Sequence, residues 1–274
     1  MARKIGYLIR FASKHHRYLL AVAGGALFFG AIFLFILIKD LPDASLIASR
    51  QVSESTKIYD RTGTILLYEI HGEEKRTIVP FEAIPDSAKK ATIAIEDENF
   101  YNHGAIDWRG IARAFFVNIL HGRIAQGGST ITQQLAKKAF LTDAKTLTRK
   151  LKEVFLAIKL ENEYTKDEIL NLYLNQIPYG SNAYGIQAAS KTFFNKDAKD
   201  LTLAESALLV GLPKAPSYYS PYGAHLKEVL ARKDLILEKM YALEFITKKE
   251  KDVAEKIKLE FAPGLTTIKA PHFS

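Results

Sequence analysis

The chain has 274 residues, of which 48% are hydrophobic and 25% charged, and a formal net charge of +8. This length and balance are those of a folded protein with one or two domains and a core that needs no crosslinks. Cysteine is absent, which excludes disulfides, thiolate metal sites and a thiol nucleophile. The positive charge favours anionic partners, namely phosphate-bearing ligands, anionic lipid or nucleic acid.

The N-terminus carries a candidate membrane anchor. Residues 1–17 contain five basic and no acidic residues, and residues 18–38 continue for 21 positions without a charge. As a helix, this stretch can cross a hydrocarbon core of roughly 30 Å. A cleaved signal peptide would have a shorter apolar region and a small-x-small site, whereas Lys-Asp-Leu-Pro follows here. We therefore expect a cytoplasmic tail at 1–17, a transmembrane helix at 18–38 and the remainder of the chain outside.

The chain then becomes mainly helical. Residues 39–55 suit a short stalk, and the β-prone stretches 56–59 and 64–70, joined by Asp-Arg-Thr-Gly, predict a small hairpin. Asp86 follows a proline and suits a helix N-cap. Apolar residues at helical spacing predict helices that include 111–119, 151–160, 162–174, 201–212 and 226–254. We expect one mainly α domain over 56–250 and a linker over 251–274.

The most polar segment is 127–134, Gly-Gly-Ser-Thr-Ile-Thr-Gln-Gln. The glycine pair interrupts helix and strand alike, and the next residues crowd hydroxyls and amides together. Such groups cannot join an apolar core unless each finds a partner. The segment is therefore either a well-capped helix start or a binding surface for an oxygen-rich ligand.

Glu96 is the first candidate for acid–base chemistry. It ends an apolar helical stretch and stands beside Asp97 and Glu98. A carboxylate that leaves a core next to like charges suits general acid–base work. The alternative is a helix end that exposes three acids to water.

Glu153 is the second candidate carboxylate. It follows Arg149 by four residues and Lys150 by three, so the three side chains share a helical face. The simpler interpretation is a surface ion pair, which contributes little. The functional interpretation is a polarised carboxylate beside a cationic cluster that holds phosphate oxygens, which Lys137, Lys138 and Lys152 could join.

Two further features keep alternatives open. No second His or Cys stands at ligand spacing from His103, so packing or capping is expected there rather than a metal site. Residues 106–123 mix Trp, Phe, Leu and Arg. They form either a buried helix or a helix that lies in a bilayer surface with its arginines among the headgroups.

Taken together, these segments resemble the peptidoglycan glycosyltransferase domain of glycosyltransferase family 51, which occurs in class A penicillin-binding proteins and monofunctional glycosyltransferases. The resemblance covers roughly residues 56–245 and the anchor. The motifs G-G-S-T-I-T-Q-Q, at 127–134, and R-K-x-x-E, at 149–153, are complete. Three other motifs, which begin at Glu96, Lys166 and Arg232, depart from the family mainly at Ala105, Asn171 and Lys233. Lysine for arginine at 233 would weaken a bidentate contact.

The resemblance implies a lysozyme-like, mainly α fold and a processive polymerase of lipid II. Glu96 would be the general base that takes a proton from the 4-hydroxyl of the acceptor GlcNAc. That oxygen would attack C1 of the donor MurNAc with inversion and expel undecaprenyl pyrophosphate. Glu153, the second catalytic residue implied, would sit in the donor subsite with Arg149 and Lys150 and orient the pyrophosphate or help neutralise it. Because a whole sugar must fit between them, we expect the two carboxyls at or beyond about 9.5 Å apart. The substrate-binding residues implied are Asp97, Phe100, His103, Arg113, Gly128, Ser129, Thr130, Gln133, Gln134, Lys137, Arg149, Lys150 and Asn175.

The resemblance also implies partners and a location. The sequence requires no cofactor, and a divalent cation (Mg or Mn) at the pyrophosphate is the one optional addition. Expected partners are lipid II, the growing glycan strand, membrane lipid and other cell-wall synthesis proteins, but not nucleic acid, because the domain would lie outside the bacterial inner (plasma) membrane, in a periplasmic or extracellular position. The Ala-Pro-His-Phe sequence at 270–273 resembles the junction to a transpeptidase domain in bifunctional members.

Two alternative functions have different sequence requirements. A lysozyme-like muramidase or lytic transglycosylase needs neither the cationic pair Arg149 and Lys150 nor a membrane-facing helix at 106–120. A non-catalytic scaffold that binds lipid II does not need both Glu96 and Glu153.

Overall fold

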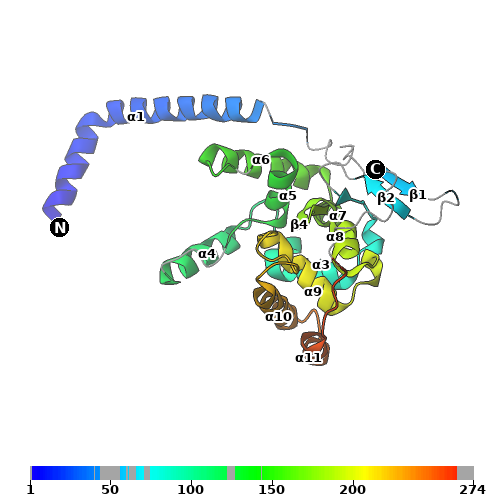
Figure 1. The fold of residues 1–274 in the computed structure, drawn as a ribbon. Helices are drawn as coiled ribbons and strands as arrows, with labels where there is room; N and C mark the ends of the chain where they lie inside the picture. The colour runs from blue at the N-terminus through cyan, green and yellow to red at the C-terminus, as the bar shows by residue number, and fades with distance from the viewer. Residues whose placement is uncertain are drawn as a thin grey trace.

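The computed structural model describes residues 2–39, 41–43, 56–59, 61, 66–70, 75–121, 127–142 and 144–263. Over these ranges the chain is mainly α-helical, which confirms the predicted fold class (Figure 1). Most of the expected stalk, most of the hairpin turn and residues 264–274 of the expected linker lie outside the described residues.

The N-terminal helix α1 spans Ala2–Lys39, so the predicted tail continues the predicted transmembrane helix. Its part Leu20–Lys39 is long and apolar enough to cross a membrane, by length and composition. Large side chains such as Phe28 and Phe35 are 63% and 68% exposed. α1 extends away from the body of the protein and contacts it at α6 (Figure 1). Its apolar surface agrees with the predicted anchor.

The strands form two small sheets. β1 (Thr56–Tyr59) and β2 (Leu66–Ile70) make the predicted antiparallel hairpin. The second sheet was not predicted: β5 (Ala183–Tyr184) pairs in parallel with β3 (Lys75–Arg76) and antiparallel with β4 (Pro178–Gly180). Strands of two or three residues are too short to give a period-two pattern, and β3 is distant from its partner in the sequence.

A first group of helices encloses the larger core. It comprises α5 (Ile131–Phe140), α6 (Leu147–Glu163), α7 (Lys166–Gln176) and α8 (Ile186–Phe194). Fully buried side chains between them include Phe100, Leu135, Leu156, Leu170 and Phe193. Threonine caps begin three of these helices, because the side chains of Thr130, Thr146 and Thr165 accept from the backbone three residues later. Short 3₁₀ turns lie at Phe81–Ala83, Phe100–Asn102, Ala198–Asp200 and Leu212–Lys214.

A second group packs closely through alanines. It comprises α3 (Asp86–Glu96), α9 (Leu203–Gly211), α10 (Leu226–Ala242) and α11 (Lys248–Lys256). Ala91, Ala94, Ala204 and Ala207 are fully buried at these contacts. The small side chains let the helix axes approach each other.

The packed domain extends beyond the expected start of the linker at residue 251. α11 contacts α10, and Phe261 stacks on Phe194 with ring centroids 5.6 Å apart. The backbone N–H of Ala262 donates to the carbonyl of Phe193. Apolar contacts therefore hold the chain on the domain as far as Ala262.

Helix α4 (Trp108–His121) projects from the body as a separate arm (Figure 1). Trp108, Phe115, Phe116 and Ile119 are between 61% and 71% exposed. The interpretation of this segment as a buried helix is therefore wrong. Its exposed apolar face agrees with a helix that lies in a bilayer surface.

Candidate active site

A cleft of about 900 Å³ is lined by residues from both helical groups and from α4. Glu96, at the end of α3, lines it together with Arg149, Lys150 and Glu153 of α6. The hypothesis that Glu96 and Glu153 act on one substrate requires a shared cleft, and both side chains line this one. Had they lain on opposite faces of the domain, the hypothesis would have been wrong.

The polar segment 127–134 has the predicted helix cap, and it also lines the cleft. Thr130 caps α5 by accepting from the N–H of Gln133, and its hydroxyl donates to the carbonyl of Ala105 at 3.1 Å. Ser129 faces the cleft and accepts from Lys150 at 2.8 Å. A Cβ on Gly128 would lie 3.2 Å from the Cα of Ile111, so glycine lets this loop lie directly against α4. The segment is a capped helix start that also forms one wall of the cleft.

Glu96 has one oxygen bound and one available. Its Oε2 accepts from Nε2 of Gln134 at 2.8 Å, while its Oε1 lies 4.0 Å from a guanidinium nitrogen of Arg232. Arg232 is held in place because its Nε donates to the carbonyl of Gly211 at 2.7 Å. Burial lowers the pKa of Arg232, and the nearby Glu96 opposes that shift. Within the described part of the chain Oε1 accepts no hydrogen bond, so it can receive a proton from a ligand.

Glu153 is fully engaged. It is 2% exposed, and its two oxygens accept from Arg149 and Lys150 respectively. The ammonium of Lys150 also donates to Ser129 and, at 2.9 Å, to Gln133, so its three protons are all in use. Glu153 therefore orients two cations, and the two positive charges at its oxygens make it a poor proton acceptor.

Arg149 presents an unsatisfied donor beside Glu153. Its Nε is buried and has no hydrogen-bond partner among the residues that the structure describes. A buried donor without a partner is costly, and the side chain that carries it lines the cleft together with Lys150. This end of the cleft is suited to an anionic group such as a phosphate.

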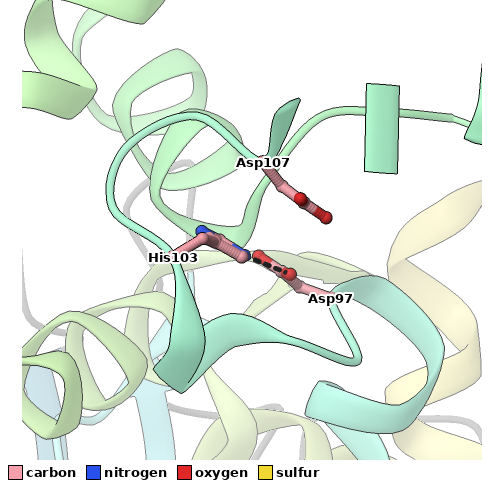
Figure 2. Close-up of side chains that lie close together, drawn as sticks. All are labelled: Asp97, His103 and Asp107. Atoms are coloured by element: carbon pink, nitrogen blue, oxygen red, sulfur yellow. Dashed lines mark hydrogen bonds and ion pairs between the residues drawn. The ribbon is translucent and has the colours of Figure 1, made fainter. Parts of the chain in front are cut away.

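Asp97, His103 and Asp107 lie close together (Figure 2), with one ligand atom from each within 4.8 Å of the others. Nε2 of His103 donates to Asp97 at 2.7 Å, and Nδ1 donates to the carbonyl of Gly104 at 2.6 Å. A carboxylate and a carbonyl only accept, so both ring nitrogens carry protons. The other oxygen of Asp97 accepts from the backbone N–H of Ile131, the first residue of α5. The cluster thus fastens the start of α5.

Opposing effects act on the pKa of His103. Burial by itself lowers the pKa, but the hydrogen bonds to Asp97 and to the carbonyl of Gly104 outweigh it and raise the pKa above its ordinary value. The raised pKa agrees with the protonated ring that the hydrogen bonds require.

The cleft collects most of the predicted site residues. Those that line it are Glu96, Asp97, Arg113, Gly128, Ser129, Thr130, Gln134, Lys137, Arg149, Lys150 and Glu153. Phe100, His103, Gln133 and Asn175 do not line it. Phe100 is fully buried in the core, whereas Gln133 contributes indirectly through its bond to Lys150.

Asn175 has a structural position. Its side chain exchanges hydrogen bonds with the backbone N–H and carbonyl of Val79, both at 3.0 Å, and donates to Asn171. It is 2% exposed, so its amide joins α7 to the segment before α3. We therefore do not assign it the predicted contact with substrate.

The motif departures also have structural explanations. Ala105 contributes its carbonyl, which accepts from Thr130 and Gln133, so alanine in place of glycine leaves that contact intact. Asn171 bonds to Asn175. Lys233 is buried and donates to the carbonyls of Ala254 and Glu255 at the end of α11, away from the cleft.

Several residues that line the cleft were not assigned to the site from the sequence, and those with a titratable side chain near Glu96 include Tyr173, Lys214, Arg232 and Lys239. Tyr173 and Arg232 stand within matched motifs, which was an available signal. The two lysines stand in no motif, and only the packing of α9 and α10 against α3 brings them to the cleft.

Comparisons with known proteins agree on one family. The sequence model of the family described as "Transglycosylase" matches residues 63–241. Penicillin-binding protein 1A of Aquifex aeolicus is 46% identical over 230 residues, which cover 84% of this chain and 31% of that protein. Penicillin-binding protein 1A of Escherichia coli is 39% identical over 267 residues, which cover 95% of this chain and 31% of that protein.

Two further similarities have comparable coverage. Penicillin-binding protein 1F of Bacillus subtilis is 47% identical over 203 residues, covering 73% of this chain and 28% of that protein. The crystal structure of penicillin-binding protein 1A from Haemophilus influenzae aligns with a TM-score of 0.46 and 26% identity, covering 77% of this chain and 22% of that chain. The chain thus spans less than a third of the length of these relatives.

Proposed function

The chain belongs to the transglycosylase family, and from that premise we propose that it is a peptidoglycan glycosyltransferase that polymerises lipid II into glycan strands. The observation that carries the proposal is that one cleft contains two different chemical environments. A glutamate with an available oxygen and the cationic cluster of Arg149 and Lys150 both line this cleft. A sugar nucleophile and an anionic leaving group need these two environments.

In the proposed reaction, Oε1 of Glu96 takes the proton from the 4-hydroxyl of the acceptor GlcNAc. The hydroxyl oxygen forms a bond to C1 of the donor MurNAc with inversion, and the bond from C1 to the pyrophosphate oxygen breaks. Arg149 and Lys150 stabilise the negative charge that develops on undecaprenyl pyrophosphate, and Lys137 lines the same cleft. Glu96 then releases its proton to solvent.

The donor environment at Glu153 bears on the divalent cation expected at the pyrophosphate. Arg149 and Lys150 already occupy both carboxylate oxygens of Glu153. Each of these oxygens keeps a second lone pair, so Glu153 could still share in holding a hard cation, which prefers oxygen ligands. The proposed reaction assigns charge stabilisation to the two side-chain cations, and the divalent cation stays a prediction.

Two exposed apolar surfaces support a location at the membrane. Leu20–Lys39 of α1 suits a single-pass anchor with its N-terminus in the cytoplasm, and the exposed face of α4 suits insertion into the outer surface of the inner membrane. α4 also lines the cleft through Gly110 and Arg113. A substrate whose lipid tail stays in the bilayer could reach the cleft along this helix. Other cell-wall synthesis proteins are proposed partners on the basis of the family alone.

The test is a polymerisation assay with the purified full chain in detergent and labelled lipid II. We expect glycan strands from the wild type and a severe loss with Glu96→Gln, while Glu163→Gln, an exposed acid on α6, stays at the wild-type rate. Digestion of finished cell wall without polymerisation would instead identify a muramidase or lytic transglycosylase. Unchanged polymerisation by Glu96→Gln would contradict the assignment of the base, and binding of lipid II without turnover would indicate a scaffold.

A further inference from the structure

Tyr173 lies against the cleft and has no part in the reaction described above. It is on α7, its side chain is 2% exposed, and its hydroxyl donates to Oε1 of Gln134 at 3.2 Å. Gln134, on α5, in turn donates through Nε2 to Oε2 of Glu96 at 2.8 Å. These hydrogen bonds therefore link α7 to α5 and α5 to α3, and the proposed base, Glu96, accepts the last of them.

The direction of these hydrogen bonds follows from which atoms can donate. An ionised carboxylate only accepts, so Gln134 turns its NH₂ group to Glu96 and its amide oxygen to Tyr173. Burial, together with the charge of Glu96, raises the pKa of Tyr173 well above its ordinary value, so the phenol keeps its proton. That hydroxyl has no second hydrogen-bond partner in the part of the chain that the structure describes. Its proton therefore holds the amide of Gln134 in one orientation.

We propose that Tyr173 is a positioning residue for Glu96 and that it acts through Gln134. With the amide fixed, an N–H stays on Oε2 of Glu96, and Oε1 remains for the proton of the acceptor hydroxyl. This inference rests on the proposed function, because it requires Glu96 to be the base.

Removal of the phenolic hydroxyl frees the amide to rotate. A rotated Gln134 presents its oxygen to Glu96, and two acceptors facing each other favour the protonated carboxyl. The protonated form cannot accept the proton of the substrate. Tyr173→Phe should therefore lower the catalytic rate most strongly at the acidic end of the pH range, which loss of packing would not do.

Tyr179 provides a matched control. It lies on β4, is fully buried, and has its pKa raised by burial and by Glu96, as Tyr173 has. Its hydroxyl, however, has no hydrogen-bond partner among the described residues. Tyr179→Phe removes the same atom from an equally buried ring without breaking the connection to Glu96.

The experiment measures lipid II polymerisation by the full chain in detergent from about pH 5 to about pH 9. For Tyr173→Phe we expect a fall in kcat of about tenfold, with KM within about twofold of wild type. The acidic limb of the profile should move up by at least about half a pH unit. Tyr179→Phe should follow the wild-type profile.

A double-mutant cycle tests the route through Gln134. In a Gln134→Leu background, Tyr173→Phe should have no further effect on kcat or on the acidic limb. The inference would be overturned by an unshifted acidic limb in Tyr173→Phe, by an equal shift in Tyr179→Phe, or by full additivity with Gln134→Leu. In each of these cases, polymerisation by the wild type would still support the proposed function. An inactive wild type would overturn the proposed function itself, and this inference with it.

Discussion

The two glutamates of the cleft have opposite environments. Glu96 accepts one hydrogen bond from a neutral amide, and the nearest guanidinium nitrogen recorded is 4.0 Å away. Glu153 is almost fully buried and contacts two cations directly. The same side chain can therefore serve two purposes, because its neighbours decide whether an oxygen is left available.

This contrast separates a residue that acts in the proposed reaction from one that holds neighbouring side chains in place. Removing the carboxylate of Glu96 takes away a proton acceptor but leaves few contacts broken. Removing that of Glu153 leaves Arg149 and Lys150 adjacent without their shared counterion. Activity and stability should consequently respond differently to the same substitution at the two positions.

The largest expected effect is on activity at Glu96. Glu96→Gln should reduce polymerisation by roughly a hundredfold to ten-thousandfold, the usual contribution of a general base. The free energy of unfolding, measured by urea denaturation, should change by less than about 1 kcal/mol, since glutamine keeps the shape of the side chain. A large loss of stability would mean that Glu96, like Glu153, supports the fold, and it would contradict the difference between the two glutamates.

A smaller loss of activity and a larger loss of stability are expected at Glu153. Glu153→Gln should lower the free energy of unfolding by about 2 kcal/mol, because it breaks a buried ion pair whose partners are partly screened by solvent. Thermal or urea unfolding measures this loss, with Glu163→Gln as the control on the same helix. A stability equal to wild type would mean that the cations do not depend on this carboxylate.

The His103 cluster, which fastens the start of α5 beside Glu96, should make stability depend on pH. The pKa of His103 is raised in the folded chain, so its contribution is complete below the unfolded-state pKa of about 6.5 and is lost as the pH rises through the raised value. The stability advantage of the wild type over His103→Gln should therefore shrink as the pH rises above about 6.5. Parallel curves for the two proteins would show that the ring does not titrate in this window.

The smallest expected effect is at Arg113, which pairs with Glu98 across the cleft rim. The two side chains are 48% and 30% exposed, so Arg113→Ala should change the free energy of unfolding by less than about 1 kcal/mol. If Arg113 contacts the substrate, as the family resemblance implies, the KM for lipid II should rise while stability stays near wild type. A stability loss as large as that at Glu153 would show that this pair holds α4 to the body.

Local patterns predicted much of this architecture. The uncharged stretch 18–38 and the hairpin follow from length and alternation, which are local in the sequence, and a capped helix start was one of the two alternatives for 127–134. The two complete motifs also placed Glu153, Ser129 and Gln134 at the site. The role of Asn175 could not be predicted, because its partner Val79 is 96 residues away in the sequence and contributes only backbone atoms. Lys214 and Lys239 could not be predicted either, because only tertiary packing brings these two lysines to the cleft.

The exposed apolar face of α4 has a consequence for how the protein meets its substrate. A domain attached to a lipid surface through both α1 and this helix would search in two dimensions, so encounters would depend on substrate per unit area rather than per unit volume. Diluting vesicles at fixed lipid composition would then leave the turnover of each bound molecule unchanged, whereas diluting the substrate with inert lipid would slow it. The density of substrate in the membrane, rather than its bulk concentration, would determine the rate.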